Sequence, residues 1–204
     1  MKRTAIKMRL KRLFDILLSI SILIFFFPVL TVMGILIKIE DDGPVIFQHF
    51  RVGKDGIAFP LYKLRSMTDK KVSEAQFDAG DPSRVTKIGS FLRKTKLDEI
   101  PQFFNVLRGD MSIVGPRPEI RKWVNTYPDR WDIILKVKPG ITDPASIAFR
   151  NEENILSQAK DPEKYYREVI LPQKLAIYET YINEQSFNYD LHLVKETIYT
   201  VIFK

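Results

Sequence analysis

A run of 22 uncharged residues near the N-terminus constrains this chain more than any other feature. It extends from Ile16 to Ile37 and contains only three polar side chains, Ser19, Ser21 and Thr31. As a straight helix the run would be about 33 Å long, which is enough to cross a bilayer. A core helix of a soluble protein would be shorter and would carry a polar face. A secretory signal would have a shorter apolar region followed by a cleavage site. The run therefore predicts insertion into a membrane.

Pro28 lies near the middle of this run and allows two arrangements in the membrane. Proline lacks an N–H and clashes with the carbonyl four residues earlier, which belongs to Ile24. The result is either a kinked helix that spans the bilayer or a helix-break-helix that enters and leaves the same leaflet. In the second case Ser21 is expected to donate to the freed carbonyl. Asp15 and Lys38 flank the run and are expected at the level of the headgroups.

The positive charge of the chain is concentrated at its N-terminus. The formal net charge is +7, and residues 1–12 carry six basic side chains and no acidic one: Lys2, Arg3, Lys7, Arg9, Lys11 and Arg12. The remaining 192 residues hold 26 basic and 25 acidic groups, so they are close to neutral. A nucleic-acid-binding domain would carry a basic face of its own, so nucleic acid is not expected as a partner. A basic tail beside an apolar run is typical of a segment that stays in the cytoplasm.

The amino-acid composition limits the kinds of reactive group that the chain can use. The chain has no cysteine and two histidines, His49 and His192, so it excludes thiolate sites, cysteine nucleophiles and a centre built from several histidines. It also lacks the glycine-rich nucleotide motifs G-x-G-x-x-G and G-x-x-x-x-G-K and any D-x-D pair. Reactive groups must therefore come from carboxylates and basic residues.

Residues 39–204 are predicted to form one compact mixed domain, because 45% of the chain is apolar and can supply a core. Residues 45–52 and 57–67 are predicted to pair as a hairpin around a turn at 53–56, with Pro60 placing the second strand at an edge. A polar loop is expected over 69–84, and helices over 85–94 and 98–107. Leu191, Val194, Ile198 and Val201 share one helical face, which favours core packing over docking on the membrane surface.

One short segment gathers carboxylates and cations. It reads RKTKLDEIPQ, from Arg93 to Gln102. Pro101 is tolerated in the first turn of a helix, so a helix is expected to begin near Asp98. Taken alone, Asp98 is best explained as an N-cap, with Glu99 a favourable charge at the helix dipole. The upstream cations, which would keep Asp98 ionised, and the free N–H groups of a helix start favour a second interpretation. In it the carboxylates hold a metal ion against a phosphate ester.

Three further basic residues are candidate phosphate ligands. Arg117 stands between Pro116 and Pro118, so a stiff backbone displays a guanidinium that is suited to bidentate phosphate contacts. Lys63 and Arg65 alternate on the expected second strand and would point to one face. The alternatives are a surface arginine in a loop and a charged strand edge that discourages aggregation.

These motifs together resemble the small monotopic phosphoglycosyl transferases, bacterial sugar transferases that start glycan assembly on a polyprenyl phosphate. The matching stretches cover most of residues 11–142 and are KRLFDILLSI, the apolar run with Pro28, GPVIFQHFRVGKDGIAFPLYKLRSM, TKIGSFLRKTKLDEIPQFFNVLRGDMSIVGPRPE and KPGIT. The pairing of LDEIPQ with NVLRGDMSIVGPRP at this spacing is highly specific. After Thr142 the match thins, and TDPASIAFRNEE stands where the family often has a GWAQVNGR-like segment, which indicates a subgroup with its own sugar preference.

The resemblance implies that sugar-1-phosphate passes from a UDP-sugar to undecaprenyl phosphate, with release of UMP. It implies that Asp98 attacks the β-phosphorus and forms a phosphosugar-aspartyl intermediate, which the polyprenyl phosphate then attacks. Glu99 is implied as the partner of Asp98, with both carboxylates as ligands of Mg²⁺. The substrate-binding residues expected from the motifs and the resemblance are Lys63, Arg65, Arg93, Arg117 and Arg150.

The expected organisation is an α+β fold in three parts: a basic cytoplasmic tail at 1–12, a re-entrant helix-break-helix anchor at 13–38 and a cytoplasmic catalytic domain at 39–204. Amphipathic helices are expected at the membrane surface. The resemblance implies a monotopic protein of the bacterial inner membrane, facing the cytoplasm, and about 12 residues before the anchor indicate the minimal form of the family. Besides membrane lipids, downstream glycosyltransferases or a second copy of the chain are candidate partners.

Two alternatives to an enzyme are a catalytically inactive membrane-anchored scaffold and a lipid-binding peripheral protein that uses its tail on anionic headgroups. The intact LDE and PRP segments argue against the scaffold. The sugar stays open among N-acetylated amino sugars, galactose, glucose and diacetamido sugars. The glycan also stays open, whether exopolysaccharide, lipopolysaccharide or glycoprotein glycan.

Overall fold

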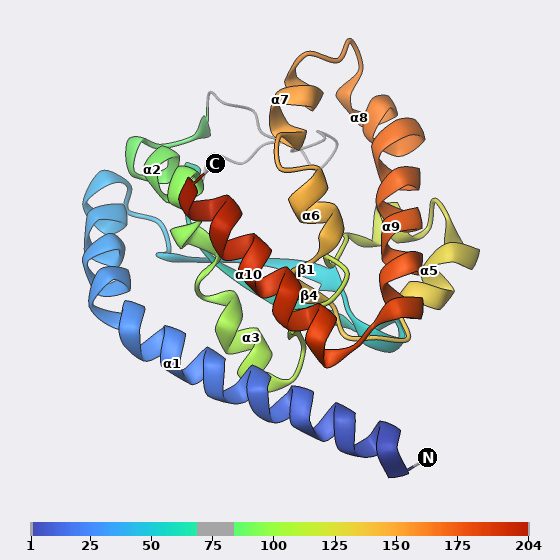
Figure 1. Ribbon diagram of the computed structural model, residues 1–204. Helices are drawn as coiled ribbons and strands as arrows, with labels where there is room; N and C mark the ends of the chain where they lie inside the picture. The colour runs from blue at the N-terminus through green and yellow to red at the C-terminus, as the bar shows by residue number, and fades with distance from the viewer. Residues whose placement is uncertain (1, 69–83, 204) are drawn as a thin grey trace.

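The computed structural model describes residues 2–68 and 84–203 and has the mixed α+β fold expected from the sequence (Figure 1). The predicted loop at 69–84 lies almost wholly outside the described residues. A long N-terminal helix, α1 (Lys2–Glu40), precedes two small two-stranded sheets and a series of helices. The other helices are α2 (Lys87–Thr95), α3 (Gln102–Arg108), α4 (Arg121–Val124), α5 (Pro128–Ile134), α6 (Pro144–Ala148), α7 (Glu152–Ser157), α8 (Pro162–Tyr165), α9 (Leu171–Glu184) and α10 (Phe187–Phe203).

Helix α1 contains the whole apolar run and stays helical through Pro28. Figure 1 shows its axis changing direction part-way along, so the expected break is a bend inside one helix and not a non-helical segment. The Ser21 hydroxyl donates to the carbonyl of Leu17 at 2.9 Å, so the prediction that it would serve the carbonyl of Ile24 is wrong.

The two sides of α1 have different surroundings. Phe14, Leu18 and Ile22 pack against the core, and the buried Asp15 accepts hydrogen bonds from the Ser112 hydroxyl at 2.8 Å and from the backbone N–H of Ile113 at 3.2 Å. The exposed large apolar residues described on this helix are Leu10, Leu13, Leu17, Ile20, Ile24, Phe25, Phe27, Val29, Val32, Ile35 and Ile39. The helix is long and apolar enough to cross a membrane, and only 6% of its most apolar stretch is buried. This excludes a buried core helix and agrees with membrane association.

The predicted hairpin is confirmed. Strands β1 (Ile46–Val52) and β2 (Ala58–Leu64) pair antiparallel, with Ile46 opposite Leu64 and Val52 opposite Ala58. A 3-10 turn at Lys54–Gly56 joins them, and its Asp55 and Gly56 have φ values of 56° and 76°. Asparagine, aspartate and glycine are the residues that adopt such values most readily.

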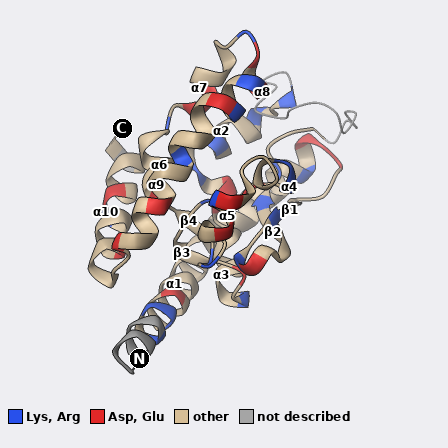
Figure 2. Ribbon diagram, turned by 90° about the vertical axis from the view of Figure 1, so that its right-hand side faces the viewer, with Lys and Arg blue, Asp and Glu red and all other residues tan. Residues whose placement is uncertain are grey.

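Figure 2 shows basic and acidic residues interspersed along the ribbon in that view.

A second sheet pairs β3 (Ser112–Val114) with β4 (Gly140–Thr142) in parallel. Two glycines make this pairing possible, because the backbones at Gly115 and Gly140 nearly touch. A Cβ atom on Gly140 would lie 2.1 Å from the backbone nitrogen of Gly115, and a Cβ atom on Gly115 would lie 2.4 Å from the carbonyl oxygen of Lys138. Any larger residue would push the strands apart and displace the segment that follows β3.

The C-terminal third forms a helical layer around the buried Trp131 and Tyr178. Here α8 passes through a π-helix at Tyr166–Ile170 directly into α9, so the helical path continues through Pro172 without a break. In α10 only the first half packs as expected. Val194 contacts the core, whereas Ile198 and Val201 are 54% and 44% exposed. Core packing therefore explains only part of this apolar face.

Candidate active site

Asp98 and Glu99 lie in a 3-10 turn, Leu97–Glu99, between α2 and α3. The predicted helix over 85–94 is confirmed as α2, which ends at Lys96 in the left-handed conformation with φ 58°. Helix α3 begins only at Gln102, after Pro101. The helix expected near Asp98 is therefore a 3-10 turn there and an α-helix only from Gln102, and Asp98 is the N-cap of neither. This turn places both carboxylates where β2 and the segment after β3 can reach them.

Glu99 is the meeting point of two cations from distant parts of the chain. Its Oε1 accepts hydrogen bonds from Lys63 Nζ on β2 at 2.7 Å and from Arg117 Nη2 at 2.8 Å. Burial alone would favour the neutral acid, but Arg117 and Lys63 outweigh it and hold the pKa of Glu99 well below its usual range. The same ion pair with Glu99 raises the pKa of Arg117. Glu99 is thus a fixed carboxylate that orients two positive groups.

Asp98 has a different environment. Its side chain is 6% exposed, and its Oδ1 is buried without a hydrogen-bond partner in the described part of the chain. Burial raises the pKa of this carboxyl, opposed chiefly by Lys63 and aided by the charge of Glu99. The net direction is opposite to the one expected from the upstream cations. A buried carboxylate oxygen with no partner is costly in a folded protein, so Asp98 is the group that has a free oxygen for a ligand.

The other three predicted ligands, Arg65, Arg93 and Arg150, have different surroundings in the structure. Arg65 is only 5% exposed and serves the connection from α1 to β1, since its Nη2 donates to the carbonyl of Asp41 at 2.6 Å. In the described part of the chain no hydrogen bond or ion pair joins Arg65 to Glu99, which Lys63 contacts. Arg93 lies near Asp98, since its charge acts to lower the pKa of that carboxyl. Its Nε donates to the Ser66 hydroxyl at 3.3 Å. Arg150 is exposed between α6 and α7, and no described contact links it to the carboxylates.

Arg117 is held by a short strut, Pro116–Pro118, that is tied to β4 at its start. The N–H of Gly140 donates to the carbonyl of Pro116 at 3.0 Å, and the N–H of Gly115 donates to the carbonyl of Thr142 at 3.1 Å. The predicted stiff display of the guanidinium agrees with this arrangement. Its side chain is 31% exposed, so it faces both Glu99 and the solvent.

Comparison with known proteins decides the family. A sequence model described as "Bacterial sugar transferase" matches residues 6–204. The chain belongs to the bacterial sugar transferase family. This confirms the resemblance inferred from the motifs, and the match continues past Thr142, where the sequence pattern departs from the one expected for the family.

Several relatives in the family are similar over much of this chain. The UDP-glucose:undecaprenyl-phosphate glucose-1-phosphate transferase of Escherichia coli strain K12 is 40% identical over 202 residues, which are 93% of this chain and 39% of that protein. A protein of the same name from Klebsiella pneumoniae is 44% identical, over 78% of this chain and 36% of its own length. The putative undecaprenyl-phosphate N-acetylgalactosaminyl 1-phosphate transferase of Bacillus subtilis strain 168 is 48% identical, over 58% and 66%. The chain spans well under half the length of the first two.

The carboxylate pair of this family member fits a hard divalent cation. Asp98 offers a free buried oxygen, and Glu99 offers a second carboxylate beside it. Within residues 2–68 and 84–203 no group of three or more His, Cys, Asp or Glu side chains could hold a metal ion. Magnesium commonly binds one or two carboxylates together with phosphate oxygens and water, so this donor set suits an ion that arrives with a phosphate substrate.

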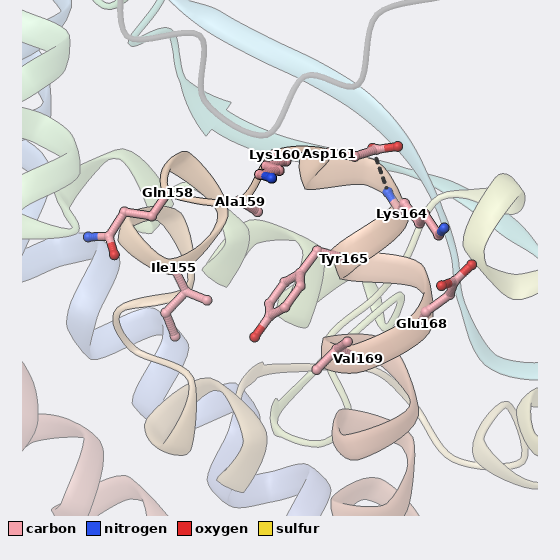
Figure 3. A pocket seen from close by; sticks show the side chains of 9 residues that line it. All are labelled: Ile155, Gln158, Ala159, Lys160, Asp161, Lys164, Tyr165, Glu168 and Val169. Atoms are coloured by element: carbon pink, nitrogen blue, oxygen red, sulfur yellow. Dashed lines mark hydrogen bonds between the residues drawn. The ribbon is translucent and has the colours of Figure 1, made fainter.

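A hollow of about 540 Å³ lies elsewhere, between α7 and α8 (Figure 3). Ile155 and Val169 line its apolar part, Lys160 and Lys164 lie at its edge, and the Tyr165 ring points into it. None of its lining residues belongs to the carboxylate site. The carboxylate pair of the family motifs, in the turn at Leu97–Glu99, therefore lies outside this hollow.

Sequence reasoning missed a layer of buried polar residues behind Arg117. It contains Glu119, Asp143, Tyr166 and Lys174, which are all less than a tenth exposed. Of these, Glu119 ends the matched stretch that contains the PRP segment, and Asp143 directly follows KPGIT. The other two carry no local pattern that distinguishes them from surface residues, because their burial depends on the packing of the C-terminal helices.

Proposed function

We propose that this chain transfers sugar-1-phosphate from a UDP-sugar to undecaprenyl phosphate through a covalent intermediate on Asp98. The observation that carries the proposal is the contrast between the two carboxylates: Glu99 is committed to Lys63 and Arg117, whereas Asp98 has an unpartnered buried oxygen. The printed names of the relatives support undecaprenyl phosphate as the acceptor. The sugar of the donor stays open, since these relatives differ in the sugar that they name.

In the first step an oxygen of Asp98 forms a bond to the β-phosphorus of the UDP-sugar, and the bond from that phosphorus to the bridging oxygen breaks. UMP leaves with the bridging oxygen, and the sugar phosphate stays on Asp98 as an acyl phosphate. In the second step an oxygen of undecaprenyl phosphate attacks the same phosphorus and releases Asp98 as a carboxylate. A carboxylate nucleophile divides one difficult transfer into two easier ones.

The cations around Glu99 supply charge for both steps. Phosphoryl transfer depends chiefly on positioning and on neutralising the charge of the phosphate oxygens. Arg117 and Lys63 are oriented by Glu99 at 2.8 and 2.7 Å, and Arg93 is near enough to act on Asp98. We assign Lys63, Arg93 and Arg117 to the phosphates of the donor. Asp98 and Glu99 would hold Mg²⁺, which when bound would supply further positive charge.

The apolar outer side of α1 supports placing the protein in the cytoplasmic leaflet of the inner membrane. We assign the change in direction of its axis to Pro28, which would turn the helix back toward the same side. The donor nucleotide is cytoplasmic, and a basic tail stays in the cytoplasm. Both arguments require residues before and after the anchor to lie on one side, which a straight spanning helix does not allow.

Asp98→Asn tests the nucleophile. The amide keeps the size of the side chain but is a far poorer nucleophile, so turnover is expected to fall by about a thousandfold or more, which corresponds to about 4 kcal/mol. The matched control is Asp132→Asn, the same change at an exposed position on α5, which should leave turnover unchanged. Wild-type protein mixed with UDP-sugar alone should gain one sugar phosphate on Asp98 and release UMP, as measured by intact mass spectrometry.

Normal turnover of Asp98→Asn, or the same adduct on that variant, would reassign the nucleophile. Complete absence of UMP release with a panel of UDP-sugars would favour the inactive scaffold instead.

Chelation tests the metal ion. Activity should be lost in EDTA and return when Mg²⁺ or Mn²⁺ is added in excess, because carboxylate and phosphate oxygens are the ligands that these ions prefer. Full activity in chelator would remove the metal from the mechanism. The measurement is UMP release by the wild-type protein, with thermal unfolding in EDTA as the control for the integrity of the fold.

A further inference from the structure

Glu119, two residues after Arg117, ties the far end of the strut to the core. Its backbone carbonyl accepts a hydrogen bond from the N–H of Val52 at 2.8 Å. Its carboxylate is buried and accepts the Tyr166 hydroxyl on Oε1 at 2.5 Å, while Arg51 Nη1 lies 3.4 Å from Oε2. A buried carboxylate is stable only when such donors satisfy it. The Tyr166 hydroxyl is the closer of these two side-chain donors.

Tyr166 is itself fixed from several sides. It begins the π-helix between α8 and α9, a rare element that is often found at functional sites. Its ring packs against Trp123 with centroids 5.0 Å apart, and Lys174 Nζ lies 5.4 Å from the ring centroid. Lys174 in turn donates to Glu152 Oε2 at 2.9 Å. A cation beside an aromatic ring is attracted to its π-electrons, so this arrangement holds the hydroxyl in one place.

The strut is therefore tied at both ends, to β4 at Pro116 and to β1 and Tyr166 at Glu119. Proline fixes its own φ and restricts the residue before it, so the Pro-Arg-Pro backbone has little freedom to absorb a shift. A displacement of Glu119 would pass directly to Arg117. The contact of Arg117 with Glu99 at 2.8 Å depends on that placement.

We propose that Tyr166 is a positioning residue: its hydroxyl, bound to Glu119, holds the strut so that Arg117 stays directed at Glu99. Tyr166 belongs to the helical layer, 47 residues from Glu119 along the chain, and no sequence motif includes it. The catalytic consequence rests on the proposed function, since it requires that Arg117 contacts the transferred phosphate. The structural consequence, which is the orientation of Arg117, does not depend on the proposed function.

Tyr166→Phe removes only the hydroxyl and leaves the ring contacts in place. Displacing a charged group by a fraction of an ångström is costly in phosphoryl transfer, so kcat is expected to fall about tenfold while KM for the UDP-sugar changes less than about threefold. The matched control is Tyr178→Phe. Tyr178 is also fully buried, and its hydroxyl makes no hydrogen bond in the described part of the chain. Its variant should keep full activity and unfold at the same or a higher temperature.

A double-mutant cycle shows whether Tyr166 acts through Arg117. In an Arg117→Ala background, adding Tyr166→Phe should change kcat by less than about twofold, because the group that it positions is gone. A second tenfold loss in that background would overturn the proposal. If Tyr166→Phe does not fold, Glu119→Gln carries the same cycle. It keeps an oxygen for the hydroxyl, so a smaller loss is expected that again disappears with Arg117→Ala.

A spectroscopic readout separates this inference from the proposed function. The side-chain Nε–Hε signal of Arg117 can be assigned in the detergent-solubilised full chain by its loss in Arg117→Ala. It should shift or broaden in Tyr166→Phe and stay in place in Tyr178→Phe. An unmoved signal in Tyr166→Phe would overturn the positioning role, even if the protein proved to have no transferase activity. Normal wild-type transfer with an unmoved signal would leave the proposed function intact.

Discussion

Among single residues, Glu99 contributes most to the arrangement of the site, because one of its oxygens accepts hydrogen bonds from both Lys63 and Arg117. These three residues come from β2, the turn before α3 and the strut after β3, so the cluster is assembled only in the fold. Arg65, two positions from Lys63, has a different role. It is buried over Gly43 and donates a hydrogen bond to Asp41. Two basic residues of the same motif are thus separated into one at the site and one that holds the connection after α1.

The contrast between these two basic residues gives a prediction. Lys63→Met should lower kcat/KM by about a hundredfold or more, since it removes one oriented charge from the phosphate site, while the midpoint of thermal unfolding changes little. Arg65→Met should lower the unfolding temperature but leave kcat per folded molecule within about threefold. Steady-state kinetics and thermal unfolding on both variants measure this. A loss of kcat in folded Arg65→Met equal to that in Lys63→Met would return Arg65 to the site.

Among the elements, α1 connects the apolar run to the elements that surround the carboxylate pair. Its buried Asp15 binds the first two residues of β3, and Arg12 donates to the carbonyls of Val106 and Leu107 at the end of α3. Cations at a helix C-terminus are favourable, so this arginine secures α3 as well as α1. These contacts fix the apolar helix α1 against α3, which follows the turn that carries Asp98.

The topology of the anchor can be measured directly, because the chain has no native cysteine. Arg9→Cys and Asp42→Cys, at exposed positions before and after the apolar run, should both react only with a thiol reagent on the cytoplasmic side. Pro28→Leu restores a helical hydrogen bond and should place part of the Asp42→Cys population on the opposite side, with a loss of activity. Labelling of Asp42→Cys from the periplasmic side in the otherwise native chain would contradict re-entry.

In the whole molecule, the exposed apolar side chains lie mainly on α1, with others on the hairpin and on the second half of α10. Apolar surface on this scale is rarely left to water. Lys11, one of the basic tail residues, donates to Asp190 Oδ2 on α10 at 2.5 Å, so it is engaged inside the protein and is not available to lipid headgroups. Because the exposed apolar surface of α1 is extensive, membrane attachment is expected to be chiefly hydrophobic.

This difference predicts how the protein leaves the membrane. High salt should release almost none of it, and a mild detergent should release nearly all, because apolar burial does not weaken with screening whereas headgroup attraction does. Quantitative immunoblotting of sedimented membranes measures both fractions. Substantial release by salt alone would support the peripheral lipid-binding alternative.

The sequence alone determined the apolar run, the hairpin, α2 and the family motifs, because these depend on side-chain periodicity and on residues that are neighbours along the chain. It also named Lys63 and Arg117 as candidate phosphate ligands, and both contact Glu99 in the structure. Only the tertiary structure decided that Arg65 lies apart, that Asp98 is buried strongly enough to raise its pKa, and that Glu119 and Tyr166 lie behind Arg117. The physical reason is the separation of these residues along the chain. The contacts Arg65–Asp41, Lys63–Glu99 and Tyr166–Glu119 join residues that are 24, 36 and 47 positions apart. No local sequence pattern specifies which distant residues come into contact.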